Sequence, residues 1–162
     1  MILIFKWVIF TFLIFFAEHI LTFKGLNFNF SFLLIYIFVI KYFFPKTEQK
    51  KIAPSEALPV LFSSGIGLIE DLFQGIIGPA IISKTITGSL LIILVKQLFF
   101  HWTEIFKAFI ILIFTVIDET IYSLIMVYFF NFNTEYIMLL KNFFIKGLIN
   151  IPLALILTWR KP

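Results

Sequence analysis

The chain contains no cysteine among its 162 residues, arginine occurs once, and charged residues make up only 14% of the total. The lack of cysteine excludes a disulfide framework, a cysteine-based zinc site and a thiol nucleophile. Ordinary soluble domains carry about 25% charged residues, and disordered chains are also rich in charge. The shortage of charge therefore excludes both a soluble globular domain and a disordered chain.

Apolar residues dominate instead, at 61% of the chain, and the mean hydropathy is +1.07. A soluble protein of this length has too little interior to bury that much apolar surface. A membrane-spanning helix needs about 20 residues, so the length allows about six spans and no separate soluble domain. The formal net charge is +4, and we interpret the lysines as setting topology and contacting anionic lipid headgroups, with no role for nucleic acid.

The pattern predicts an all-α integral membrane protein with one transmembrane domain over residues 1–162. The first apolar stretch lacks a small-residue cleavage site, so we expect it to be retained as a span. A basic, hydrophilic linker over 45–56 separates the first two stretches from the last four. The third stretch is short for a bilayer, which leaves a re-entrant segment open as an alternative. The six predicted spans cover 2–23, 28–44, 58–73, 76–100, 105–130 and 136–159.

The distribution of basic residues predicts that both termini are cytoplasmic. With six spans, the inner side holds nine of the 13 basic residues, including the Arg160–Lys161 tail. The outer side holds Lys24 and Lys141, while Lys84 and Lys146 lie within spans. This bias is the positive-inside pattern of a multi-pass membrane protein. A five-span arrangement would place the basic tail outside and lose part of the bias.

Several charged residues fall at membrane depth, where each costs about 2.5–3.5 kcal/mol to insert. Counted along the helices, they gather in the outer half of the membrane. Charges at such depth are expected to pair with one another or to face a wet cavity. Two interpretations stay open: an ion-pair network that fixes helix order, and a polar cavity for a ligand or for a segment of a partner. The residues of this predicted network are Glu18, His19, Glu70, Asp71, Lys84, Asp118, Glu119, Lys141 and Lys146.

No catalytic constellation is evident, and we predict a non-enzymatic protein without cofactor or metal. The two histidines, His19 and His101, fall on opposite sides of the membrane in this topology. Serines at Ser63–Ser64 and Ser83 are typical of helix packing more often than of nucleophiles, although Lys84 follows Ser83. The pairs Glu70–Asp71 and Asp118–Glu119 suggest an aspartyl dyad, but adjacent acids point about 100° apart on a helix.

The most specific local pattern is a glycine–acid segment. Gly67, Asp71 and Gly75 recur at i, i+4 and i+8, so two glycines flank Asp71 on one helix face, where a neighbouring backbone can approach closely. Gly78 then allows a sharp turn. We expect Lys84, on the next helix, to reach back and pair with Asp71. Glu70 is rotated off the glycine face and is expected to matter less.

This segment, from about Gly65 to Gly88, resembles the rod shape-determining MreD family. Members are small six-span proteins with a Gly-x-x-x-Asp-x-x-x-Gly core, a second glycine shortly after it, and often a Ser-Lys-Thr-x-x-Gly run in the next helix. Glu70, a second acid beside the core aspartate, departs from that pattern. The matching residues are Gly67, Asp71, Gly75, Gly78, Ser83, Lys84, Thr85 and Gly88, and we predict that Gly67, Asp71, Gly75, Gly78 and Gly88 form the helix-packing or partner interface.

The resemblance implies a membrane subunit of the bacterial wall-elongation (rod) complex. Its usual partner would be the bitopic protein MreC. It would act beside the cytoskeletal MreB, the SEDS-type glycosyltransferase RodA and a transpeptidase. The family's fold is similar to that of substrate-binding subunits of energy-coupling-factor transporters. That similarity supplies the alternative function: a vitamin-binding transporter subunit of the same size, with six spans and an outward-opening polar pocket.

Overall fold

The computed structural model describes Ile9, Ile20 and residues 11–18, 29–43, 55–97, 103–131 and 136–158. Residues 11–18 are helical, and no strand occurs among the described residues. The predicted all-helical class is therefore confirmed for this part of the chain. The remaining helices are α2 (Phe30–Phe43), α3 (Ala57–Gln74), α4 (Pro79–Gln97), α5 (Glu104–Phe130) and α6 (Tyr136–Thr158).

Three segments are long and apolar enough to cross a membrane by length and composition: Pro79–Gln97, Ile105–Phe130 and Leu139–Leu157. Helix α2 is also apolar, but its 14 residues extend only about 21 Å, less than the hydrocarbon thickness of about 30 Å. The bounds of α3, α5 and α6 lie within a residue of the apolar stretches predicted for them. Most of the predicted linker, residues 45–54, lies outside the described residues.

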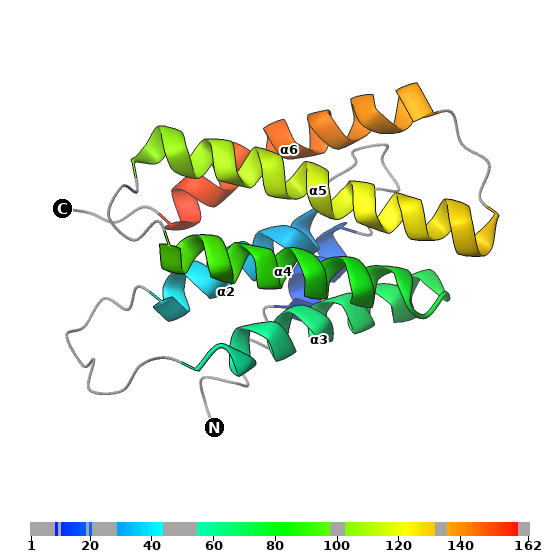
Figure 1. Ribbon diagram of the computed structural model, residues 1–162, viewed down its shortest axis with the longest axis horizontal. Helices are drawn as coiled ribbons and strands as arrows, with labels where there is room; N and C mark the ends of the chain where they lie inside the picture. Colours follow the sequence, from blue (N-terminus) through cyan, green and yellow to red (C-terminus); the bar gives the residue numbers. More distant parts are fainter. Residues whose placement is uncertain are drawn as a thin grey trace.

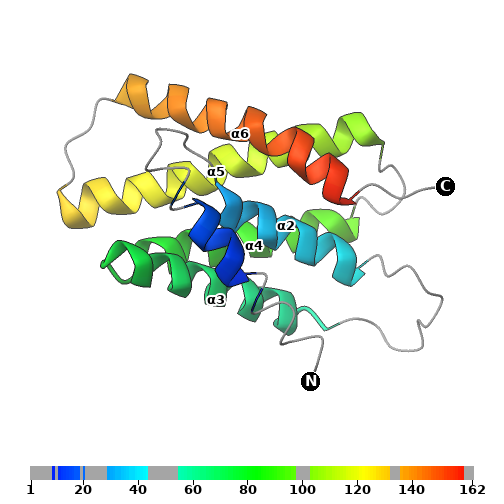
Figure 2. The same ribbon diagram turned by 180° about the vertical axis from the view of Figure 1, so that it is seen from behind.

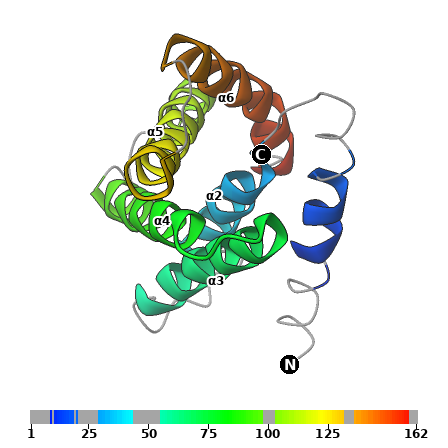
Figure 3. The same cartoon turned by 90° about the vertical axis from the view of Figure 1, so that its right-hand side faces the viewer.

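Helix α2 is the centre of the bundle. It packs against α3, α4, α5 and α6, and the end-on view shows these four helices arranged around it (Figure 3). Its buried side chains lie on every face, which is why its sequence is apolar all round rather than amphipathic. Aromatic stacking fixes it on two sides, since Phe38 stacks on Phe62 at 4.0 Å and Phe32 stacks on Phe114 at 6.5 Å.

The other helices form two antiparallel pairs that lie on either side of α2, α3 with α4 and α5 with α6 (Figure 1). At one end of the bundle, Lys96 at the end of α4 forms an ion pair with Glu56 and lies 6.0 Å from the Phe43 ring centre. The ends of α2 and α4 therefore meet the start of α3. Seen from the back of the bundle, the helical residues 11–18 lie in front of α2 (Figure 2), and Phe15 stacks on Phe73 of α3 at 5.8 Å.

Glycine allows α3 and α4 to pack in backbone contact. A Cβ on Gly67 would lie 2.5 Å from the Ala80 carbonyl oxygen and 2.6 Å from the Ile81 Cα. A Cβ on Gly88 would overlap the Ser63 side chain. By contrast, a Cβ on Gly65 would meet nothing within 4 Å. The close approach of the hairpin therefore depends on the first two glycines and not on the third.

We expect Gly67→Ala to destabilise the protein by about 1–3 kcal/mol, because the added methyl forces two helix backbones apart. Gly65→Ala is the matched control, two residues earlier on the same helix, and it should be neutral or slightly stabilising because alanine favours a helix over glycine. The measurement is the unfolding midpoint of each variant in detergent. Equal midpoints for the two variants would contradict the packing seen between α3 and α4.

Candidate functional site

Asp71 is the acceptor for the start of α4. Its carboxylate accepts the backbone N–H groups of Gly78 at 2.8 Å, Ala80 at 2.8 Å and Ile81 at 3.1 Å. The first turn of any helix leaves N–H groups without intrahelical partners and carries a partial positive charge. A fully buried carboxylate from the preceding helix supplies both the acceptors and the negative charge. Asp71 therefore joins α3 to α4 across the turn.

The turn itself explains two of the motif glycines. Gly75 ends α3 in the left-handed region, with φ of 73°, and Gly78 has φ of 128°, which residues with a side chain rarely adopt. The predicted ion pair between Lys84 and Asp71 is wrong. Asp71 is occupied by the three N–H groups, and Lys84 lies further along α4, where its side chain faces α5.

Asp118, midway along α5, is the centre of the buried charges. Lys84 forms an ion pair with its Oδ2, and the Ser83 hydroxyl donates to its Oδ1 at 2.6 Å. The Asn29 side-chain amide also donates to Asp118 Oδ2, at 2.9 Å. Lys84 and Asp118 are both at most 2% exposed, so this pair is shielded from solvent. Three donors, two from α4 and one from the residue before α2, thus converge on one carboxylate.

Two further carboxyl groups extend this arrangement. Lys146 of α6 pairs with Glu119 Oε1 at 2.9 Å, and the same Asn29 amide nitrogen donates to that oxygen at 2.8 Å. Glu70 of α3 lies 3.3 Å from Lys84, so one lysine is shared by two acids. We refer to these residues together as the polar cluster, which joins α3, α4, α5 and α6 to the start of α2: Asn29, Glu70, Ser83, Lys84, Asp118, Glu119 and Lys146.

The structure brings most of the predicted network together but not all of it. Glu18 is half-buried and interacts electrostatically with Glu70, Lys84, Lys146 and Glu119. Lys141 is exposed on α6 and takes no part in the contacts of the polar cluster within the described residues. His19 lies outside the described residues, so its predicted place in the network stays a prediction.

The sequence pattern did not point to two asparagines that the structure places at the site. Asn29 accepts the backbone N–H of Phe32 at 2.9 Å through its side-chain oxygen, which caps α2, while its amide nitrogen donates to Asp118 and Glu119 of α5. Asn150 of α6 donates to the Asn29 carbonyl oxygen at 3.0 Å and to the Thr115 hydroxyl at 3.4 Å. Asn150 could have been noticed in the sequence, because it is an amide within an apolar stretch. Asn29 could not, because in the sequence it belongs to what looks like an ordinary polar turn.

The nucleophile and dyad interpretations gain no support from these contacts. The Ser83 hydroxyl is held as a donor to Asp118, and Lys84 is engaged with two carboxylates rather than poised as a base for Ser83. Asp71 and Asp118 serve different partners, so they do not form a pair that could share a proton. Within the described ranges, no three His, Cys, Asp or Glu side chains are grouped to hold a metal ion.

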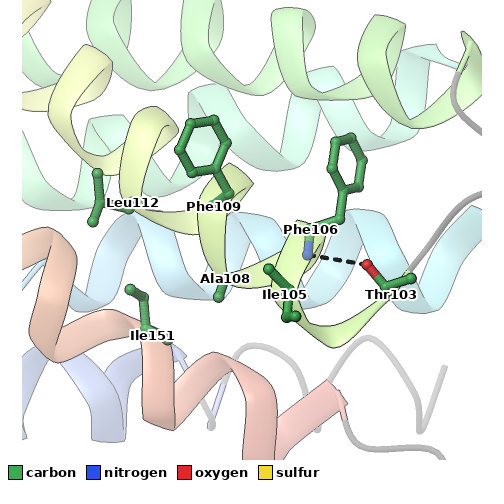
Figure 4. A pocket seen from close by; sticks show the side chains of 7 residues that line it. All are labelled: Thr103, Ile105, Phe106, Ala108, Phe109, Leu112 and Ile151. Atoms are coloured by element: carbon green, nitrogen blue, oxygen red, sulfur yellow. Dashed lines mark hydrogen bonds between the residues drawn. The ribbon is translucent and has the colours of Figure 1, made fainter.

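An apolar groove of about 510 Å³ lies between the first half of α5 and α6 (Figure 4). Among the described residues, Thr103 is the only polar one that lines it, and its hydroxyl accepts the backbone N–H of Phe106 and so caps α5. This lining holds no charged group and therefore offers nothing for acid–base or ionic chemistry. The other residues that line the groove are Ile105, Phe106, Ala108, Phe109, Leu112 and Ile151.

Compared with models of known protein families, with curated proteins and with solved structures, the chain matches none.

Proposed function

We propose that this chain is a non-enzymatic subunit of the bacterial wall-elongation (rod) complex, related to the MreD family. It spans the cytoplasmic membrane six times, keeps both termini inside and binds a bitopic partner of the MreC type. Through that partner it acts with the MreB cytoskeleton, the SEDS glycosyltransferase and the transpeptidase.

The observation that carries the proposal is the α3–α4 hairpin. Each residue of the motif on which the resemblance rests has its own structural role in the hairpin. Gly67 admits the backbone of α4, Asp71 caps that helix, and Gly75 and Gly78 shape the turn. Ser83 and Lys84 join the hairpin to α5, and Gly88 receives Ser63. A motif in which each of these positions has a physical role is a sounder basis for a family proposal than spacing alone.

The topology is supported by the charged end of the bundle. Lys96 and Glu56 meet there with the end of α2, and the sequence places most basic residues on that side. We therefore expect no activity from a reporter fused after Pro162 that works only outside the cytoplasm. A reporter that works only in the cytoplasm should be active at the same position. The reverse result would overturn the six-span orientation.

In a rod-shaped bacterial host that carries this gene, depletion should round the cells, because the elongation machinery loses a membrane subunit. Complementation with Gly65→Ala should restore rods, whereas Gly67→Leu should not, because leucine cannot fit against the α4 backbone. Affinity purification in mild detergent should also recover a bitopic cell-shape protein with the wild type.

Normal rods after verified loss of the protein, without a paralogue, would refute the proposal. The alternative, a substrate-binding subunit of an energy-coupling-factor transporter, makes the opposite prediction: tight binding of a vitamin and unchanged cell shape. The same depleted strain tested for growth on limiting vitamins separates the two functions.

A further inference from the structure

Pro152 lies within α6 and removes one hydrogen bond from that helix. Proline has no backbone N–H, so the carbonyl oxygen of Leu148, four residues earlier, lacks its normal intrahelical donor. Leu148 is the middle residue of the apolar span Leu139–Leu157. The hydrocarbon core of a bilayer holds no water that could replace the lost donor, and a backbone acceptor without a donor is costly there. This carbonyl oxygen therefore calls for a donor from a neighbouring element.

The described part of the bundle does not supply that donor. The buried side of α6 carries Asn150, whose amide donates to the Asn29 carbonyl oxygen at 3.0 Å. Leu148, which is 47% exposed, and Pro152, also exposed, lie on the other side of the helix. No side chain of the described residues donates a hydrogen bond to Leu148. A donor for its carbonyl oxygen must come from a different molecule.

The apolar groove between α5 and α6 opens beside this carbonyl group. Ile151, which lines the groove, lies about one turn from Leu148 on α6. On α5, the lining side chains of Ile105 and Phe109 are exposed, so the groove is open to the membrane, and Ala108 contributes only a methyl group to the lining (Figure 4). A groove of about 510 Å³ for apolar side chains thus lies next to an acceptor without a donor.

We propose that this surface of α5 and α6 binds the single membrane-spanning helix of another protein. Apolar side chains of that helix fill the groove, and a hydroxyl, amide or indole group at its middle donates to the Leu148 carbonyl oxygen, as polar side chains do between membrane helices. The inference rests on the proposed function in one respect, because it identifies this helix as the span of the bitopic partner.

Two other occupants of the groove fit the surface less well. The acyl chain of a lipid matches an apolar groove but carries no donor for the carbonyl oxygen. A second copy of this chain brings no donor to the same depth through the groove, because Thr103 is the one polar lining residue among those described and it lies at the end of α5.

The test is site-specific cross-linking in the membrane of a host that carries a tagged copy of the bitopic partner. The photo-reactive amino acid benzoylphenylalanine replaces Leu148 in one variant. In the control it replaces Leu61, a leucine of α3 that is 66% exposed on the other side of the bundle. Leu148 should cross-link to the membrane span of the partner, at a position located by mass spectrometry, and Leu61 should not. Cross-linking from Leu61 but not from Leu148, or from Leu148 only to lipid or to a second copy, overturns the proposal.

Pro152→Ala separates partner binding from folding, because it gives the Leu148 carbonyl oxygen an intrahelical donor. Recovery of the partner should fall by roughly threefold to tenfold, the effect of losing one hydrogen bond between membrane helices. The thermal unfolding midpoint of the chain alone in detergent should rise or stay the same, because alanine favours a helix interior over proline. Undiminished recovery of the partner with Pro152→Ala would overturn the assignment of the donor.

Ala108→Phe tests the groove itself. The added ring fills the groove and should abolish the cross-link from Leu148. Gly65→Phe is the control, since it adds a larger side chain on α3 at a position where an added Cβ meets nothing within 4 Å, and it should preserve the cross-link. A cross-link that survives Ala108→Phe would show that the partner does not occupy the groove.

The surface and the proposed function fail in different ways. If the bitopic cell-shape protein co-purifies with the wild type but cross-links only elsewhere, the surface is wrong and the role in wall elongation stands. If Leu148 instead cross-links to the span of a different single-span protein, and Pro152→Ala weakens that contact, the surface is right and the proposed function is wrong.

Discussion

Lys84→Met should lower the free energy of unfolding by about 3–5 kcal/mol, the largest loss that we expect from any single substitution in the polar cluster. The methionine fills a similar volume, but Asp118, which is 0% exposed, is left without its cation, and Glu70 loses the same partner. The measurement is unfolding by a denaturing detergent in mixed micelles, followed by fluorescence.

The double variant Lys84→Met with Asp118→Asn should be more stable than the sum of the single losses predicts, by at least about 1 kcal/mol, because neither charge is then stranded. Lys141→Met serves as the matched control. Lys141 is exposed on α6, and its loss should change stability by less than about 0.5 kcal/mol. Strictly additive losses for Lys84 and Asp118 would show that their contact contributes nothing.

Asp71→Ala should cost about 3 kcal/mol for a different reason. The change removes the acceptor of three backbone N–H groups at the start of α4, and each stranded group in an apolar setting is expensive. Asp71→Asn should lose less, because the amide oxygen still accepts. Glu70→Gln, on the adjacent residue, should also lose less, since Lys84 keeps its contact with Asp118.

The decisive comparison combines Asp71→Ala with Lys84→Met. Because the two side chains serve different partners, their losses should add to within about 0.5 kcal/mol. If the interaction energy between Asp71 and Lys84 proved as large as that expected between Lys84 and Asp118, then Asp71 and Lys84 would form an ion pair, against the observed contacts.

The helical class and the extents of α3, α5 and α6 could be predicted from the sequence, because long apolar runs interrupted by glycine, proline and polar turns leave little choice of element. The sequence also predicted one buried cluster that includes Glu70, Lys84, Asp118, Glu119 and Lys146. That prediction came from counting how far along its helix each residue lies, and the rise per residue is the same in every helix.

The pairing within the cluster could not be predicted in this way. Asp71 is close to Lys84 in the sequence and was therefore predicted to be its partner. The first turn of a helix, however, needs acceptors for its free N–H groups, and Asp71 supplies them for α4. Lys84 instead contacts Glu70, the neighbour of Asp71 on α3, and Asp118, which is 34 residues away and is brought close by the packing of α4 against α5. Asn29 was missed for a related reason, since its contacts with Asp118 and Glu119 cross 89 and 90 residues of chain.

The central place of α2 has a consequence for how the protein is made. This helix leaves the ribosome early, yet Asn29 at its start receives Asn150 from the last helix, 121 residues later. Until α5 is synthesised, the Asn29 amide lacks the Asp118 and Glu119 carboxylates that it binds, and α2, a helix of 14 residues, lacks the neighbours that later enclose it. The core therefore closes at the end of synthesis rather than span by span. Proteins shortened within α6 should accumulate as unassembled chains that membrane proteases remove, even though every earlier helix is intact.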